Sequence, residues 1–273
     1  MKKFFSVKDN FKKIIKSKLC DVVSINQIAT GWTNFVFDVK TKTNEYIFRF
    51  PRNNFFASVL EKEVKFTQFV KDKLTTKVAD IKLFYIKGKP YTMHVKIKGK
   101  SLTQVSNKLS YFKKRKIAKQ TVNFIYELQQ IDIKTFDFSL PTTTQFLNEL
   151  SKVDDEEYDL KKHDNLKQLE QQRLVLNHAD LNPGNILVDD NFNVCAILDF
   201  AFVSVSSDIN DISRLIGRLP KSYHKIMLKQ FNKKFKTKVN ITQVYNVVHV
   251  WDYVEAHYIN YMKKNMPEID IGR

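Results

Sequence analysis

The spacing of apolar and polar positions changes about a third of the way along the chain. Before residue 100, short apolar stretches bounded by turn residues predict strands at 24–30, 34–40, 45–50, 81–86 and 91–95. One segment in this part, 60–74, repeats its apolar residues at helical spacing instead. Beyond residue 100 the helical period dominates, and it predicts helices within 109–130, 142–150, 222–236 and 242–264.

This change of pattern predicts an α+β fold of two lobes. We expect a small antiparallel-sheet lobe at 1–96, which clamps a nucleotide, and a larger, mainly helical lobe at 97–273, which carries catalysis and substrate binding. A cleft between two such lobes is a natural place for a ligand. The first 18 residues are interrupted by charges and predict an amphipathic helix, and the chain has no apolar run long enough to cross a membrane. We therefore expect no membrane insertion.

Composition narrows the picture only a little. The chain has 46 basic and 29 acidic residues, a formal net charge of +17, which raises the hypothesis of a nucleic-acid partner. The basic residues are spread along the whole chain and follow no nucleic-acid-binding motif, so we expect no such partner. The two cysteines, Cys20 and Cys195, are too few for a disulfide framework or a zinc site, and they indicate a reducing cytoplasm.

The segment 177–200, NHADLNPGNILVDDNFNVCAILDF, carries the clearest chemistry. Two short apolar runs flank a turn-rich loop that holds Asp180 and Asn185, and Asp199 follows the second run. Carboxylate and amide oxygens are ligands that Mg²⁺ accepts beside substrate phosphates, and a carboxylate free of metal can take a proton from a hydroxyl. Asp and Asn are also common turn residues. Several positions here match one template together, and this favours a catalytic loop.

The template is that of a known superfamily. The residues resemble the Brenner-type motif shared by protein kinases and by the aminoglycoside phosphotransferase and choline kinase superfamily: His178, Ala179, Asp180, Asn185, Asp199 and Phe200. Ala179 stands where protein kinases have an arginine, and Ala201 stands where they have the glycine of Asp-Phe-Gly. The chain is therefore more similar to the small-molecule kinases. The resemblance implies a protein-kinase-like fold over nearly the whole chain.

The resemblance also implies roles for the loop residues. Asp180 would orient or deprotonate the acceptor hydroxyl, while Asn185 and Asp199 would bind Mg²⁺. His178 would hold the catalytic loop in shape, and Asp211 would brace that loop from a later segment. The phosphate donor would be ATP, with GTP as a possible alternative.

The N-terminal part is expected to hold the nucleotide. Gly31, Thr33 and Asn34 resemble the phosphate loop of choline kinases, although a plain hairpin turn would explain them equally well. The segment 92–102 resembles the hinge of the superfamily, where backbone groups at His94 and Val95 would meet the purine.

Arg49 occupies the position of the kinase lysine on the third strand. An arginine there can clamp two phosphate oxygens in a fork. Its expected partner is a glutamate on the following helix, for which Glu63 fits best and Glu61 is the alternative.

For the acceptor, three residues near the C-terminus share one helix face: Trp251, Glu255 and Tyr258. An aromatic wall beside a carboxylate suits a quaternary ammonium, and bacterial choline kinases have similar aromatics, so we expect choline or ethanolamine. A plain aromatic core stripe is the alternative interpretation. Aminoglycosides, which the acidic segment 154–159 could attract, thiamine and homoserine are other acceptors on the same scaffold. A catalytically silent binding protein is the alternative of another class, and the intact catalytic set speaks against it.

Overall fold

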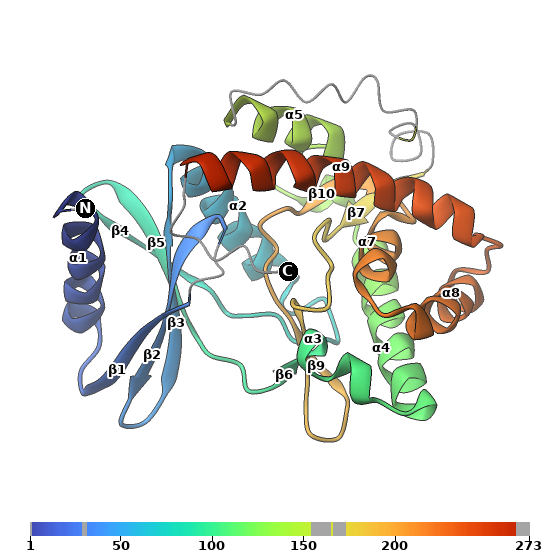
Figure 1. The fold of residues 1–273 in the computed structure, drawn as a ribbon, viewed down its shortest axis with the longest axis horizontal. Coiled ribbons are helices and arrows are strands. Elements are labelled where there is room, and N and C mark those ends of the chain that lie inside the picture. The colour runs from blue at the N-terminus through green and yellow to red at the C-terminus, as the bar shows by residue number, and fades with distance from the viewer. Residues whose placement is uncertain (1, 29–31, 154–164, 166–172, 266–273) are drawn as a thin grey trace.

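The computed structural model describes residues 2–28, 32–153, 165 and 173–265. It confirms the predicted α+β class, with an antiparallel sheet in the N-terminal part and a helical C-terminal part (Figure 1). The sheet has five strands in the order β1-β2-β3-β5-β4. Its strands and the two helices that pack on it are α1 (Lys2–Lys18), β1 (Val22–Ile28), β2 (Asn34–Thr41), β3 (Glu45–Pro51), α2 (Asn54–Val70), β4 (Lys82–Ile86) and β5 (Lys89–Val95).

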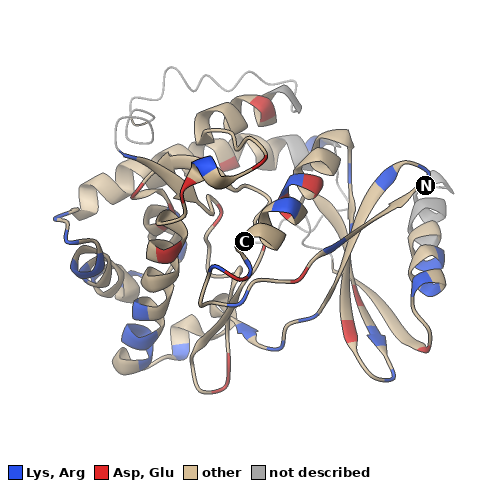
Figure 2. Cartoon of the chain, turned by 180° about the vertical axis from the view of Figure 1, so that it is seen from behind, with Lys and Arg blue, Asp and Glu red and all other residues tan. Residues whose placement is uncertain are grey.

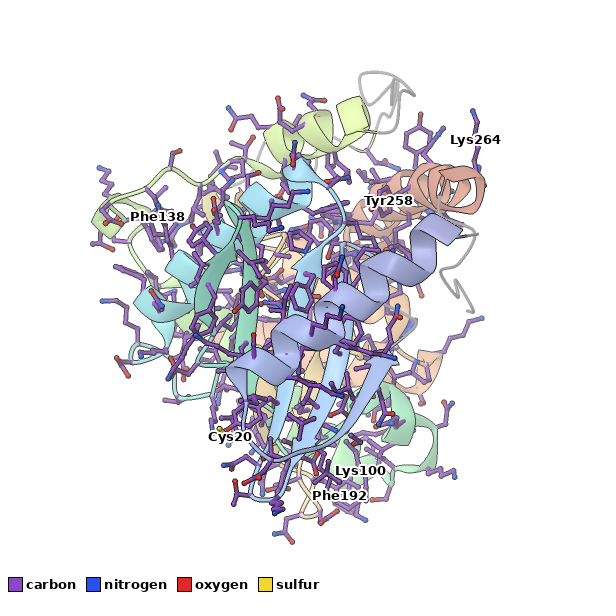
Figure 3. All side chains as sticks on the ribbon, turned by 90° about the vertical axis from the view of Figure 1, so that its left-hand side faces the viewer. Cys20, Lys100, Phe138, Phe192, Tyr258 and Lys264 are labelled. Carbon is purple, nitrogen blue, oxygen red and sulfur yellow. The ribbon has the colours of Figure 1, made fainter. Side chains whose placement is uncertain are left out.

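The two faces of this sheet are covered by different helices. Helix α1 lies across the outer face (Figure 3), where the Phe11 ring stacks 4.2 Å from the Phe50 ring and Ile15 is fully buried. Helix α2 lies on the face toward the other lobe (Figure 1). It begins six residues before the predicted segment because the Asn53 side chain caps it, accepting a hydrogen bond from the Phe56 amide at 2.9 Å.

The C-terminal part combines helices with two small sheets, β10-β7 and β6-β8-β9. The chain leaves the large sheet at Val95, and the next strand pairs with β8. A division into separate units at 1–96 and 97–273 stays a prediction. The elements of this part are β6 (Lys100–Ser101), α3 (Leu102–Val105), a 3₁₀ turn (Ser106–Lys108), α4 (Tyr111–Gln129), a 3₁₀ turn (Ile133–Thr135), α5 (Thr143–Val153), β7 (Leu174–Asn177), β8 (Ile186–Val188), β9 (Val194–Ile197), β10 (Ser204–Ser207), α7 (Asn210–Arg218), α8 (Lys221–Phe235) and α9 (Ile241–Asn265).

Two connections and one long helix determine where the site lies. The loop between β7 and β8 carries the predicted catalytic residues, and the turn after β9 carries Asp199. Helix α9 runs across the C-terminal part and reaches α2 (Figure 1), where the rings of Tyr258 and Phe56 meet edge to face, 6.4 Å apart. This helix therefore connects the two halves beside the loop.

Charge is distributed over both lobes (Figure 2). A basic cavity of about 530 Å³ lies between α4 and α8, and among the described residues five cationic and no acidic ones line it: Arg115, Lys116, Lys119, Lys233 and Lys234. The expectation that the protein binds no nucleic acid stays a prediction. Within the described residues, no helix is both long and apolar enough to span a bilayer.

Candidate active site

A cavity of about 780 Å³ lies between the two lobes and is lined by residues from both of them. The N-terminal lobe contributes residues from β1, β2, β3, α2 and β5. The C-terminal lobe contributes residues from α3, the loop after β7, the turn after β9, and helices α5, α7 and α9. Its charged and polar lining residues include Thr33, Asn34, Arg49, Glu63, His94, Asp180, Asn182, Asn185, Asp199, Arg214, Arg218 and Glu255. Most of the residues expected to form the site therefore meet in one place.

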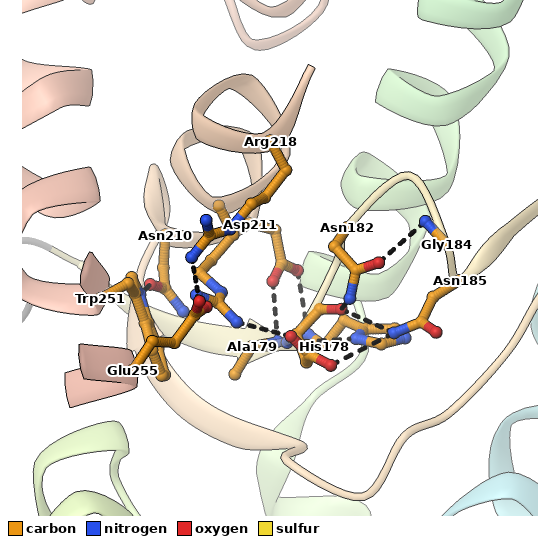
Figure 4. A network of polar contacts seen from close by, with 12 residues as sticks. His178, Ala179, Asn182, Gly184, Asn185, Asn210, Asp211, Arg218, Trp251 and Glu255 are labelled. Carbon is orange, nitrogen blue, oxygen red and sulfur yellow. Dashed lines mark hydrogen bonds and ion pairs between the residues drawn. The ribbon is translucent and has the colours of Figure 1, made fainter. Parts of the chain in front are cut away.

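The predicted catalytic loop is held by the carboxylate of Asp211. Asp211, fully buried at the start of α7, accepts hydrogen bonds from the amides of His178 at 2.9 Å and Ala179 at 2.8 Å (Figure 4). Ala179 has φ of 61°, a left-handed conformation that costs an alanine about 1 kcal/mol. The His178 ring nitrogen Nε2 lies 2.9 Å from the Leu198 carbonyl oxygen, next to Asp199. These contacts fix the two residues that precede Asp180.

Asp180 is held at both carboxylate oxygens. Oδ1 accepts a hydrogen bond from Arg214 Nη2 at 2.5 Å, and Oδ2 lies 3.3 Å from Asn185 Nδ2 (Figure 4). Burial raises the pKa of the Asp180 carboxyl, while the Arg214 guanidinium acts in the opposite direction. Because only Oδ2 is left with a weak partner, this oxygen is the one available to a hydroxyl in the cavity.

Asn185 and Asp199 are the candidate metal ligands. The Asn185 amide nitrogen donates to the Asp180 carbonyl oxygen at 2.9 Å, so the Asn185 amide oxygen is turned away from Asp180. Asp199 has φ of 63°, and its buried Oδ1 has no hydrogen-bond partner; the nearest cation is Arg49 Nη1 at 3.7 Å. A carboxylate and an amide oxygen facing a cavity suit Mg²⁺, which completes its shell with water and phosphate. No three His, Cys, Asp or Glu side chains within the described ranges cluster as a metal cage of their own.

Across the cavity, Arg49 of β3 pairs with Glu63 of α2. Arg49 Nη2 lies 2.8 Å from Glu63 Oε2, and the amide of Phe200 donates to Glu63 Oε1 at 3.1 Å. Burial raises the pKa of the Glu63 carboxyl to about 7, although Arg49 favours its ionised form. The alternative partner, Glu61, instead accepts a hydrogen bond from the Tyr85 hydroxyl at 2.8 Å.

Only some of the residues expected to form the nucleotide loop and the hinge line the cavity. Thr33 and Asn34 line the cavity, whereas Gly31 lies outside the described residues. His94 also lines it, and burial, together with Arg49, lowers the pKa of its imidazole to about 3, so that the ring is neutral. Val95 is 57% exposed and is not one of the lining residues.

Two of the three residues that were expected to meet the acceptor, Trp251 and Glu255 on α9, have partners within the chain. Trp251 is buried and donates from Nε1 to Asn210 Oδ1 at 2.9 Å (Figure 4). The Arg214 guanidinium carbon lies 4.3 Å from the centroid of the Trp251 ring. Glu255 accepts a hydrogen bond from Arg214 Nη1 at 2.5 Å and another from Arg218. An arginine of the chain therefore stands where an acceptor ammonium was expected.

Arg214 and Arg218 were missed by the sequence analysis. A signal was available, since they follow Asp211 by three and seven positions and so share its face of α7. The ring of Tyr258, the third expected acceptor residue, lies 5.9 Å from the Trp32 ring and 6.4 Å from the Phe56 ring. The acidic segment 154–159 lies outside the described residues.

The chain therefore has a kinase-like phosphotransferase fold, in which an antiparallel-sheet lobe and a helical lobe enclose these groups. The particular family follows from a comparison with family models. The chain belongs to the phosphotransferase enzyme family abbreviated APH, whose model matches residues 24–231.

Solved structures with the same fold are distant in sequence. One is wild-type aminoglycoside 2'-phosphotransferase-IIIa in complex with GDP, which is 16% identical with a TM-score of 0.73 over 95% of this chain and 94% of that one. Another is macrolide 2'-phosphotransferase MphH from Brachybacterium faecium, which is 11% identical with a TM-score of 0.64 over 97% and 99% of the two chains. A comparison with curated proteins found no match.

Proposed function

We propose that this chain transfers the γ-phosphate of a nucleoside triphosphate to a hydroxyl of a small molecule, with Asp180 as its catalytic residue. The observation that carries the proposal is the convergence of three oxygen-bearing side chains on one cavity: Asp180, Asn185 and Asp199. The buried pair of Arg49 and Glu63 lines the same cavity from the other lobe. Membership of the phosphotransferase family supports the reaction class.

In this mechanism Asp180 acts on the acceptor. Its Oδ2 accepts the hydroxyl proton, which then passes to solvent, as the acceptor oxygen forms a bond to the γ-phosphorus. The bond from that phosphorus to the oxygen bridging it to the β-phosphate breaks, and its electron pair leaves with the nucleoside diphosphate. The chain forms no covalent intermediate, and its contribution is positioning and electrostatics.

The remaining residues serve the phosphates. Arg49 is already directed by Glu63, and its guanidinium can bind phosphate oxygens as a fork. Asn185 and Asp199 would hold Mg²⁺, which, when bound, offsets the negative charge of the phosphates. The donor is proposed to be ATP, with GTP as the alternative, and related structures are complexes with ATP and with GDP. Gly31, Thr33, Asn34, His94 and Val95 are proposed to surround the nucleotide.

Two classes of acceptor are proposed for testing. Choline or ethanolamine rests on the resemblance of the Gly31–Asn34 loop and Arg49 to choline kinases. An aminoglycoside or macrolide rests on the related structures, which include an aminoglycoside phosphotransferase with gentamicin and a macrolide phosphotransferase. Thiamine and homoserine complete the panel. A nucleotide-binding protein without turnover is the alternative of another class.

The test is release of nucleoside diphosphate with each acceptor in the panel. Asp180→Asn should lower kcat by about 10²–10⁴-fold and leave the nucleotide Kd nearly unchanged, because the substitution removes the proton acceptor and not the phosphate site. Asp190→Asn is the matched control, since that side chain is 92% exposed and lies outside the cavity. If the Asp180→Asn protein turned over at the unaltered rate, this residue would have no part in the mechanism. If none of the tested acceptors led to release of nucleoside diphosphate, the silent binding protein would be favoured.

A further inference from the structure

The side of the cavity that is formed by α5, α7 and α9, called the acceptor side below, contains a cation that belongs to the chain itself. Arg214, buried on α7, donates to Asp180 on one side and to Glu255 on the other, at 2.5 Å each (Figure 4). Its guanidinium also lies over the ring of Trp251. One turn further along α7, Arg218 donates to the second oxygen of Glu255 and lies 3.4 Å from Asp252.

This arrangement occupies the carboxylate and the aromatic ring that the sequence suggested for a positively charged acceptor, Glu255 and Trp251. An ammonium group binds to a carboxylate or to the face of an aromatic ring. Glu255 already meets two guanidiniums, and these lower the pKa of its carboxyl although burial acts in the opposite direction. The ring of Trp251 already has a cation over it.

A substrate cannot easily take the place of Arg214. Its side chain is 7% exposed, and to leave the site it would have to break hydrogen bonds to two carboxylates. A buried charge that loses its partner is strongly destabilising. The arginine is therefore a permanent part of the wall.

The charges on this wall cancel. Among the described lining residues on the acceptor side, the carboxylates of Asp180 and Glu255 are matched by the guanidiniums of Arg214 and Arg218. The other lining residues from α5, α9 and the nearby loops present apolar or aromatic side chains: Trp32, Phe146, Leu150, Phe202, Val254 and Tyr258. A polycation that entered this part of the cavity would find no unpaired negative charge to bind among these lining residues.

We propose that the acceptor is an alcohol with an apolar body and no net positive charge, and that Arg214 and Arg218 are the residues that exclude cationic acceptors. The proposal rests on the proposed phosphotransferase function, since it concerns the acceptor of that site. It specifies the acceptor class beyond the panel above, and within that panel it disfavours choline, ethanolamine, thiamine and the aminoglycosides. Discrimination here comes from repulsion of the wrong ligand as much as from attraction of the right one.

Fluorescence can test this without turnover. The chain has two tryptophans, Trp32 and Trp251, and both line the cavity. The probes are choline and 3,3-dimethyl-1-butanol, its neutral carbon isostere, which differ in charge and not in shape. With the full chain, the neutral compound should change the emission at a concentration lower than choline by about tenfold or more. Equal or tighter binding of choline, or no response to the neutral compound, overturns the proposal.

Variants of Arg218 then locate the cause. Arg218→Met removes one of the two cations on Glu255 and leaves the contacts of Arg214 in place. The wall then carries two carboxylates and one guanidinium, so the preference for the neutral compound should fall by about fivefold or more, because the excess negative charge attracts choline. Arg218→Gln is the second variant, which keeps a hydrogen bond to Glu255 should the methionine protein fold poorly. Lys225→Met, an exposed cation on α8 outside the cavity, is the matched control.

An unchanged preference in both Arg218 variants overturns the assignment of that residue. These outcomes are separate from those of the proposed function, which depends on nucleotide binding and phosphate transfer. A protein that prefers the neutral compound but never transfers phosphate would uphold the charge argument and refute the kinase activity. A protein that phosphorylates choline and binds it more tightly than the isostere would do the reverse.

Discussion

Replacing Arg49 by methionine tests the buried ion pair between strand β3 and helix α2 of the N-terminal lobe. Arg49 is 8% exposed and Glu63 is 1% exposed, with 2.8 Å between the paired atoms. Methionine fills much of the same volume but leaves the Glu63 carboxylate without its cation. Breaking a buried pair from one side costs about 3–5 kcal/mol of unfolding free energy. In a chain of this size, that loss lowers Tm by roughly 6–10 °C.

A second substitution should reverse part of this loss. Glu63→Gln removes the carboxylate charge and keeps an oxygen to accept the hydrogen bond from the Phe200 amide. In the double variant no buried charge is left unpaired, so it should be more stable than Arg49→Met alone by about 1 kcal/mol or more. This non-additivity is the signature of a direct interaction between the two side chains.

Urea denaturation followed by far-UV circular dichroism measures the four proteins of the cycle. Arg115→Met, the same substitution on the exposed side of α4, is the control and should change the unfolding free energy by less than about 0.5 kcal/mol. The reasoning is refuted if the double variant is less stable than Arg49→Met, because the loss would then not come from an orphaned carboxylate.

Three further substitutions test the packing around the site, each by equilibrium denaturation. Asp211→Asn should cost about 2–4 kcal/mol, because one charged acceptor for two loop amides is lost; a loss below this range would mean that the loop holds its shape without it. Gly217→Ala should destabilise by about 1–3 kcal/mol, since a Cβ there would lie 2.9 Å from Val248 Cγ1, and adding Val248→Ala should restore stability. Trp251→Phe should cost about 1–3 kcal/mol by leaving the buried Asn210 oxygen unpaired, and a neutral effect would show that this hydrogen bond contributes nothing.

The convergence of Asp180, Asn185 and Asp199 could be predicted because its geometry is local. Asp180 and Asn185 lie on one short connection between two strands, and Asp199 follows the next strand. The apolar runs on either side determine where those strands begin and end. Residues brought together over such short separations leave the fold few alternatives, so a sequence pattern was enough to place them in one cavity.

The choice between Glu61 and Glu63 shows a limit of the same reasoning. Both lie on the helix that follows β3, but two positions along a helix turn the side chain to the opposite face. Glu63 faces the cavity and Glu61 faces β4, where it meets Tyr85. Apolar spacing favoured Glu63 because the neighbouring core positions fix the rotation of the helix.

The arginines of α7 could not be assigned in this way. Arg214 meets Asp180, 34 positions earlier, and Glu255, 41 positions later. Helical spacing indicates only that Arg214 and Arg218 share a face. The carboxylates that they meet depend on how α7 packs against α9 and the catalytic loop, which is a tertiary contact. The predicted aromatic wall at Trp251 therefore did not include Arg214, because this contact depends on tertiary packing.

One face of α7 thus carries three charged side chains with three different partners. Asp211 holds the loop backbone, Arg214 holds Asp180, and Arg214 and Arg218 together hold Glu255. Removing Glu255 would leave two guanidiniums without their main partner, whereas removing Arg218 leaves Glu255 paired with Arg214. Because taking a carboxylate from two guanidiniums is the costlier change, the proposed acceptor preference should be easier to alter at Arg218 on α7 than at Glu255 on α9.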